Sequence, residues 1–232
     1  SDYRRAFQPG GTFFFTVVSY RRRPFLTEAR SRQALRQAFE HTRVRFPFRQ
    51  EAVVLLPDHL HCLWTLPEGD ADFSVRWKVI KFRFDRLYLG SGGSEATVGD
   101  SGRRRRERGL WQRRFWEHTV RNAREFEILC NYIHYNPVKH GYATCPHAWP
   151  FSTFGKCVAM DDIQPIGVAD ATDPSPERGA TTGIDDYRRM MEMVDVQTST
   201  LQNSGGHIQS RGVDVPKSTI SFGRRYRQMA TP

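Results

Sequence analysis

Hydrophobic residues fall into short clusters along the chain, and their spacing separates predicted strands from predicted helices. Strands are expected where aromatic and β-branched residues run together between turn residues. These stretches are TFFFTVVSY at 12–20, EAVVLL at 51–56, a histidine-containing run within 55–67, and LWQRRFWEHTV at 110–120. Pro57 and Asp58 link the second stretch to the third, which predicts a hairpin. WPFSTF at 149–154 is expected to dock on the core as its last segment.

Two stretches repeat apolar residues at the spacing of an amphipathic helix. The first begins near Thr27, which is the predicted N-cap. The second covers residues 73–89, and its remaining faces carry Arg76, Lys78, Lys81, Arg83 and Arg86. Such a basic face is either solvated or follows a phosphate backbone, and the pattern alone leaves both interpretations open.

A third helix is predicted from Asn122, because Glu125 three residues later completes the pattern of a capping box. We expect this helix to end near Asn136, because Pro137 disfavours the α conformation in the residue before it. Tyr132 and Asn136 are four residues apart and therefore share one face of the helix. A phenol is a candidate nucleophile and an amide oxygen a candidate metal ligand. Taken singly, a rim tyrosine and a turn-forming asparagine are the commoner interpretations.

His59 and His61 lie two apart in the apolar run LLPDHLHCLWTLP. Alternate residues of a strand share one face, so both imidazoles point the same way, with bases roughly 7 Å apart. Leu60, Cys62 and Trp64 would face the other side. Two histidines on one strand face can hold a metal ion, or they can be ordinary residues of a half-solvated strand.

The charge balance narrows the class of partner. Lys and Arg number 35 against 25 Asp and Glu, a formal net charge of +10. Such an excess is typical of proteins that bind polyanions, and aromatic residues at 12% of the chain favour nucleic acid over a merely basic enzyme. The predicted DNA surface consists of Arg4, Arg5, Arg21, Arg22, Arg23, Arg76, Lys78, Lys81, Arg83, Arg113 and Arg114, with Trp116 or Trp77 stacking on unpaired bases. Trp77 fits the core equally well.

One domain is expected over residues 1–157. Residues 90–109 show no hydrophobic pattern, which predicts a flexible insertion with a basic tip. Residues 158–232 are rich in Gly, Ser, Thr, Asp and Pro, which predicts a largely disordered tail with a candidate docking helix at 184–194. The four cysteines lack CxxC spacing and are expected to be free thiols. Neither a membrane-spanning run nor a signal peptide is recognisable, so we expect a cytoplasmic protein without a membrane partner.

Six blocks of the sequence, in this order, resemble the REP-associated tyrosine transposases, which are single-tyrosine relatives within the HUH nuclease superfamily. The blocks are GGTFFFTV, VVLLPDHLHCLWTLPEGD, FSVRWKVIK, RRFWEHTVRN, YIHYNPVKHG and WPFSTF. The insertion at 90–109 is longer than the resemblance leads us to expect, and the tail has no assigned counterpart. The resemblance implies an α+β fold in which a central antiparallel sheet of ferredoxin-like type carries helices on its faces.

The same resemblance implies a role for each candidate residue. His59 and His61 correspond to the HUH pair, Tyr132 to the nucleophile and Asn136 to the third metal ligand. The implied metal is Mg²⁺ or Mn²⁺, although two imidazoles alone favour zinc, nickel or copper. The implied substrates are single-stranded DNA hairpins of repetitive extragenic palindromes, bound by a monomer in the nucleoid.

The chemistry implied is transesterification through a 5′-phosphotyrosine. Two alternatives remain open on the sequence. A HUH replication initiator or relaxase would share this chemistry but act on an origin or nick site. A non-catalytic nucleic-acid-binding domain would carry the two histidines incidentally.

Overall fold

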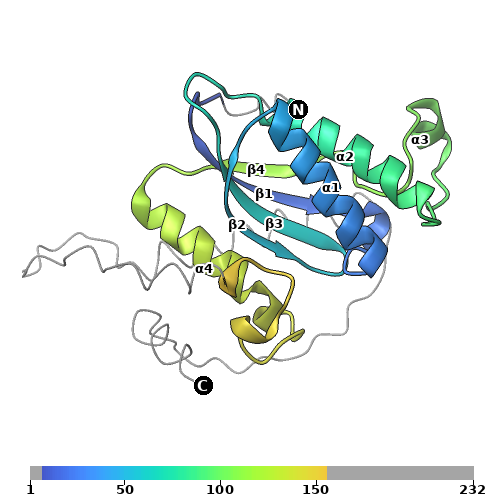
Figure 1. The fold of residues 1–232 in the computed structure, drawn as a ribbon. Coiled ribbons are helices and arrows are strands. Elements are labelled where there is room, and N and C mark those ends of the chain that lie inside the picture. The colour runs from blue at the N-terminus through green and yellow to red at the C-terminus, as the bar shows by residue number, and fades with distance from the viewer. Residues whose placement is uncertain (1–6, 156–232) are drawn as a thin grey trace, which may run out of the picture.

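The computed structural model describes residues 7–155, which form an antiparallel sheet with helices on both faces (Figure 1). The four strands lie in the order β2-β3-β1-β4. They are β1 (Thr12–Val18), β2 (Arg49–Leu55), β3 (His59–Thr65) and β4 (Trp116–Thr119). All three strand pairings are antiparallel, and β2 and β3 form the predicted hairpin. The predicted α+β architecture is confirmed.

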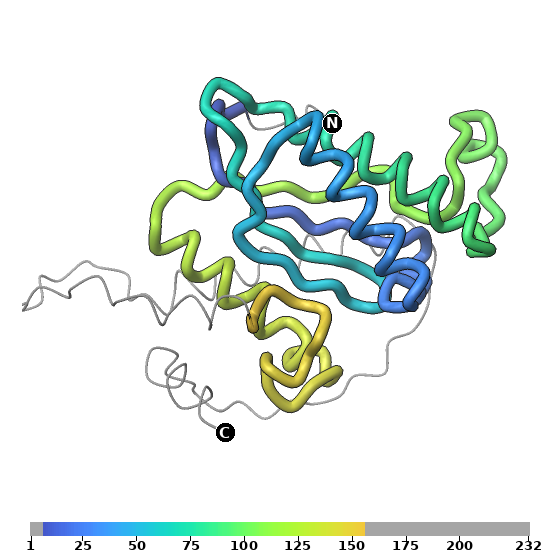
Figure 2. The backbone as a smooth tube through the Cα atoms, in the orientation of Figure 1, coloured from blue at the N-terminus to red at the C-terminus, as the bar shows by residue number. Residues whose placement is uncertain are grey.

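Helices α1 and α2 cover one face of the sheet and α4 covers the other (Figure 2). The helices are α1 (Ala29–Arg45), α2 (Phe73–Gly90), α3 (Asp100–Arg104) and α4 (Ala123–Lys139), with short 3-10 turns at Tyr20–Arg22 and Pro146–Ala148. Strand alternation sends Phe13 and Phe15 toward α1 and α2, and Phe14 toward α4. Each face of the sheet therefore has its own apolar core.

Two boundaries differ from the sequence predictions. Helix α1 begins at Ala29 with Glu28 as its N-cap, and no side chain caps it, so the prediction that Thr27 is the cap is wrong. The predicted strand at 110–120 forms regular pairing only over β4, while Trp111 makes an isolated bridge to Ser19. Propensity marked the right stretches, but pairing partners decided where the regular structure begins.

Helix α4 begins as predicted, with the Asn122 side chain accepting a hydrogen bond from the Glu125 amide at 2.8 Å. The prediction that it ends near Asn136 is wrong, because the helix continues through Pro137 to Lys139. Both Asn136 and Pro137 are buried, so packing overrides the local preference against a helical residue before proline. As a result, Asn136 keeps its place on the helix face that carries Tyr132.

The segments that close the fold are tied to the sheet and to the helices. The insertion, predicted to be flexible, contains α3 and is closed on itself by the hydrogen bond from Ala96 N to Gly109 O, 3.3 Å. Arg30 of α1 ties it to the body by donating to Gly92 O at 2.9 Å. The segment 149–154 docks along β2, where Leu55 N donates to Phe151 O and Thr153 N donates to Val53 O, both near 2.9 Å. Within residues 7–155, no helix is long and apolar enough to cross a membrane. The predicted tail, its docking helix at 184–194, Arg4 and Arg5 lie outside the described residues.

Candidate active site on the α4 face of the sheet

His59 and His61 lie side by side on β3 and face α4, as the alternation of the strand predicts. Their ring centroids are 4.9 Å apart, so the rings lean together from their positions on the strand. Both are buried, at 2% and 0% exposure, which corrects the picture of a half-solvated strand face. Cys62 and Trp64 point into the opposite core.

Each imidazole is held through its Nδ1 atom by a different neighbour. His59 Nδ1 lies 2.6 Å from Asp58 Oδ1, and because the carboxylate only accepts, Nδ1 carries the proton. His61 Nδ1 lies 2.9 Å from Thr16 Oγ1, its partner across the β1–β3 ladder. Arg22 Nη1 donates to Asp58 Oδ2 at 2.6 Å and holds the carboxylate in turn. The rings are thus oriented by contacts made on the side away from their Nε2 atoms.

Both Nε2 atoms are buried and have no hydrogen-bond partner in the structure. A proton on Nδ1 of His59 leaves its Nε2 with a lone pair, as a metal ligand requires. Burial, followed by the nearby positive charges, lowers the pKa of His61 well below its usual range, so this ring is neutral at physiological pH. Burial alone would raise the pKa of Asp58, but the contacts with His59 and Arg22 outweigh it and bring that pKa to about 2. The acid beside the pair is therefore ionised. His59 presents a lone pair at Nε2, and His61 does so in the tautomer whose Nδ1 donates to Thr16 Oγ1.

Tyr132 and Asn136 project from α4 toward the same place. The Tyr132 ring centroid is 5.2 Å from that of His61, and Phe14 packs against both rings. Asn136 is 1% exposed, and neither its amide oxygen nor its amide nitrogen has a hydrogen-bond partner. A buried amide without partners costs free energy unless something else binds it. The structure therefore brings the phenol to the histidine pair and presents Asn136 with unsatisfied polar atoms.

The rim of the site carries residues that the sequence analysis did not assign. Lys139 Nζ lies 5.4 Å from the centroid of the Tyr132 ring, which places a cation beside the phenol. Asp58 and Thr16 were missed as well. Thr16 carried a usable signal, since it is the polar residue in the middle of the apolar run of β1. Asp58 was assigned only to the hairpin turn. Its position next to His59 in the sequence was the signal that could have identified it.

The residues suit a metal ion as an incomplete set of ligands. No group of three or more His, Cys, Asp or Glu within residues 7–155 is arranged to hold one. Two imidazole nitrogens and the Asn136 amide oxygen are the donors present, all three buried and without hydrogen-bond partners. Such a set would leave further coordination positions to water or to a bound phosphate.

The predicted DNA-binding residues fall into distinct groups. Lys78, Arg113 and Arg114 are exposed, Arg83 is half-buried, and Lys81 Nζ donates to Gln112 O at 2.9 Å. Arg22 is committed to Asp58, whereas Arg23 donates to Ser94 in the insertion and Arg21 stays exposed.

Arg76 is corrected by the structure, because it is 1% exposed and pairs with Asp70 at 2.6 Å inside the fold. Of the two tryptophans, Trp77 is core, stacked on Trp64 with ring centroids 4.4 Å apart. Trp116 is half-buried and packs beside Phe14 on the α4 face of the sheet, at a centroid distance of 5.6 Å.

Comparison with known proteins gives the site its context. Over 174 residues the chain is 42% identical to the REP-associated tyrosine transposase of Escherichia coli (strain K12), a match that covers 75% of this chain and 94% of that protein. The chain belongs to the REP-associated tyrosine transposase family. It is also 39% identical over 163 residues to a putative REP-associated tyrosine transposase of Haemophilus influenzae, covering 69% of this chain and 89% of that one.

A solved structure agrees with this membership. A REP-associated tyrosine transposase bound to a REP hairpin shares 42% identity with this chain at a TM-score of 0.58, covering 78% of this chain and 99% of that one. A search of protein-family models gives no match. As a transposase-family protein with this fold, the chain is a DNA-processing enzyme, and the geometry above locates its candidate active site.

Proposed function

We propose that this chain is a metal-dependent single-stranded DNA endonuclease and strand transferase that acts on REP hairpins. The observation that carries the proposal is the pair of buried, unpartnered Nε2 atoms of His59 and His61 beside the phenol ring of Tyr132. Family membership supports it, since a relative with 42% identity has been solved with a REP hairpin bound. A monomer suffices for this site, because all of its side chains come from one chain.

His59, His61 and Asn136 are the proposed ligands of Mg²⁺ or Mn²⁺. When bound there, the ion would polarise a non-bridging oxygen of the scissile phosphate and stabilise negative charge on it. Asp58 and Thr16 hold the two rings so that Nε2 of each faces the site. Lys139 adds a positive charge on the side of Tyr132. Together the ligands orient the phosphate, and the phenol approaches it from α4.

The proposed step is a transesterification. Tyr132 Oη attacks the scissile phosphorus and loses its proton, and a bond forms between that oxygen and the phosphorus. The bond from phosphorus to the 3′ oxygen breaks, and the leaving oxygen takes up a proton to become a 3′-hydroxyl. The 5′ phosphate stays on Tyr132 as a phosphodiester. Attack by a 3′-hydroxyl reverses the step, so strand transfer needs no nucleoside triphosphate.

The test uses Tyr132→Phe, with Tyr135→Phe as its matched control on the same helix. Wild type and control, mixed with a single-stranded REP hairpin and Mn²⁺, should give a protein–DNA adduct that survives denaturing electrophoresis. Tyr132→Phe should bind the hairpin with unchanged affinity and give no adduct. An adduct mapped to Tyr135, or cleavage by Tyr132→Phe, would overturn the assignment of the nucleophile.

The metal assignment has a test of its own. His59→Ala and His61→Ala should abolish cleavage and lower Mn²⁺ affinity measured by calorimetry, while hairpin affinity stays close to that of the wild type. Full cleavage by either variant would remove these histidines from the proposed metal site. Because calorimetry measures binding without turnover, the ligand assignment does not depend on the nucleophile.

A further inference from the structure

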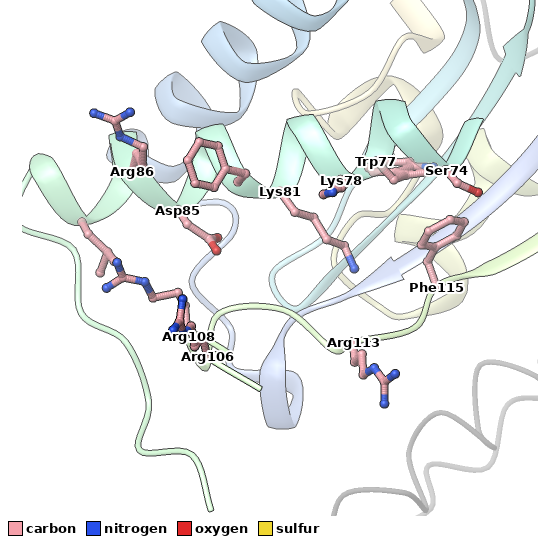
Figure 3. Close-up of a pocket in the computed structure, with 12 residues that line it drawn as sticks. Ser74, Trp77, Lys78, Lys81, Asp85, Arg86, Arg106, Arg108, Arg113 and Phe115 are labelled. Atoms are coloured by element: carbon pink, nitrogen blue, oxygen red, sulfur yellow. The ribbon is translucent and has the colours of Figure 1, made fainter. Parts of the chain in front are cut away.

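A basic groove lies on the side of the sheet away from the histidine pair. It has a volume of about 720 Å³ and runs between α2 and the segment that leads from the insertion into β4 (Figure 3). Trp77 and Phe115 at its wall belong to the core beneath α1 and α2, whereas His61 and Tyr132 face α4. The groove is therefore separate from the candidate active site.

The groove is strongly positive. Its lining contains six basic side chains against one carboxyl group, Asp85, and the six are Lys78, Lys81, Arg86, Arg106, Arg108 and Arg113. Figure 3 shows Asp85 projecting from α2 on the side of Arg106 and Arg108, and Lys81 projecting toward the stretch at Arg113. The insertion and α2 thus bring cations together that are distant in the sequence. An extended polyanion, rather than a single small anion, matches a set of charges spread along a groove of this size.

An aromatic side chain lies within the same row of cations. Phe82 is 60% exposed although it is a large apolar residue, and it lines the groove one helical turn from Lys78 and from Arg86. The Arg86 guanidinium lies 5.9 Å from the centre of its ring. Cations alternating with an exposed aromatic ring are the arrangement by which proteins hold single-stranded nucleic acid, with phosphates on the cations and bases on the ring.

The edge strand connects this groove with the active-site face. Strand β4 is the last strand at one side of the sheet, and Phe115 and Trp116 are consecutive residues at its start. Phe115 lines the groove, whereas Trp116 packs beside Phe14 on the face of Tyr132. Arg113 and Arg114 are exposed where the chain enters this edge. A single DNA strand that passes round the β4 edge would therefore meet aromatic and basic groups on both sides of the sheet.

We propose that the groove between α2 and the insertion binds the phosphate backbone of an unpaired DNA flank that continues from the active site round the β4 edge. The inference rests on the proposed function for the identity of the nucleic acid. It assigns the insertion a task, which is to supply Arg106 and Arg108 to a second stretch of the same strand. Phe82 stacks on a base of that stretch.

The test compares two double variants with the same loss of charge in the same segment. Arg106→Ala/Arg108→Ala removes groove cations, and Arg104→Ala/Arg105→Ala removes exposed cations that do not line the groove. In each pair one arginine has a distant carboxylate partner, Glu95 at 3.7 Å for Arg108 and Glu107 at 3.9 Å for Arg105. The two variants are therefore matched in charge, in location and in lost ion pairs.

Binding is measured by fluorescence anisotropy on hairpins without a flank and with unpaired 5′ or 3′ thymidine flanks of about 4 to 16 nucleotides. The wild type should gain affinity with one of the flanks. The groove variant should lose that gain, and its salt dependence on the flanked hairpin should become shallower by about 1.4 in slope, since each single-strand phosphate contact contributes about 0.7. Phe82→Ala should lose part of the gain without a change in slope. The control variant should match the wild type.

Equal losses in the groove and control variants, or a flank-dependent gain that survives in the groove variant, would overturn the inference. Every protein in this comparison, the wild-type reference included, carries Tyr132→Phe in addition, and the measurements are repeated with EDTA, so that neither cleavage nor metal affects them. A failure of Tyr132 as the nucleophile would appear in the adduct assay and leave these affinities unchanged. The two proposals therefore fail in different experiments.

Discussion

Asp58 links the half-buried Arg22 to His59, a proposed metal ligand in the interior. One of its oxygens holds His59 Nδ1 and the other accepts from Arg22. A carboxylate behind a ligating histidine fixes the tautomer of the ring and raises the basicity of the nitrogen that faces the metal. Arg22 is held with φ near +52°, an unusual conformation for a residue with a side chain, so the turn that positions it is strained.

Asp58→Asn should weaken Mn²⁺ binding by about 10- to 100-fold, because the amide keeps the size of the side chain but loses its charge. The measurement is a Mn²⁺ titration followed by calorimetry, with hairpin affinity as the second readout. Asp70→Asn is the matched control, since Asp70 also pairs with an arginine, Arg76, but does not hold a histidine. An equal loss of Mn²⁺ affinity in both variants would show that lower stability of the fold, and not the lost contact with His59, weakens metal binding.

Asp85 makes stability depend on pH. Burial raises its pKa from 3.8 to about 7, against the opposing charges of Lys81 and Arg108 and together with the like charge of Glu95. The folded protein therefore holds this proton more tightly than the unfolded chain, so stability is greatest at acid pH and falls as pH rises from about 4 to about 7. Asp85→Asn should remove this loss. The change that it causes in the free energy of unfolding should be more favourable at pH 8 than at pH 4 by up to about 4 kcal/mol. Urea unfolding at several pH values measures it, and a difference that does not grow with pH would count against it.

Single residues show what the sequence could and could not predict. The shared face of His59 and His61 was predictable because strand alternation is a local rule. The contact of His61 with Thr16 was not, because it depends on the register between β1 and β3. Arg76 was misassigned because its helix face, which the sequence shows as basic, is covered by the loop that carries Asp70. Local pattern gives the direction of a side chain on its own element, and tertiary packing decides what it meets.

At the scale of elements, the caps separate sequence pattern from actual contact. Asn122 and Thr27 both precede helices and both look like N-caps. Only the Asn122 side chain caps its helix, by accepting a hydrogen bond from a backbone N–H, and no side chain caps α1. Asn122→Ala should therefore lower the free energy of unfolding by about 1 kcal/mol, whereas Thr27→Ala should change it little. Chemical denaturation measures both variants. A loss for Thr27→Ala as large as that for Asn122→Ala would contradict the assignment of the α1 cap.

The end of α4 beyond Pro137 shows why the shared face of Tyr132 and Asn136 was predicted better than the end of the helix that carries them. The rule about residues before proline is a tendency, and here the burial of Asn136 and Pro137 outweighs it, although Pro137 has no N–H to donate to the carbonyl four residues before it. The pairing of Tyr132 with Asn136 depends only on their separation of four residues. The two residues would share a face whether the helix ended at Asn136 or at Lys139.

At the scale of the molecule, the segment docked on the edge of β2 leads to a prediction of where the chain can be cut. Trp149 Nε1 donates to Leu55 O at 3.0 Å, and Phe154 is buried near the end of the described residues. A chain ending at residue 156 should unfold cooperatively and bind hairpin DNA. A chain ending at residue 148 should be less stable by at least about 2 kcal/mol, from the lost burial of Phe154 alone. Thermal unfolding of the two shortened chains tests this boundary. A chain ending at residue 156 that fails to unfold cooperatively would refute it.

The fold class was predictable because strand and helix patterns are strong here and because the six family blocks resemble known sequences. The pattern of hydrophobic residues alone did not give the strand order, since nothing in that pattern states that β1 lies between β3 and β4. That order depends on pairings between distant residues, such as Phe14 with His118.

The order β2-β3-β1-β4 also sets a sequence of events during synthesis. When the ribosome has completed residue 90, three strands and the two helices on one face are available, but α4 has not been made. Phe14, Val54 and Leu63 would then lie on an uncovered sheet face together with the two histidines. The nascent chain thus exposes an apolar surface that carries the two proposed metal ligands for the time needed to translate about 50 residues, a few seconds at typical elongation rates. Stalled chains of that length are expected to be the form that chaperones capture, and release is expected once α4 emerges.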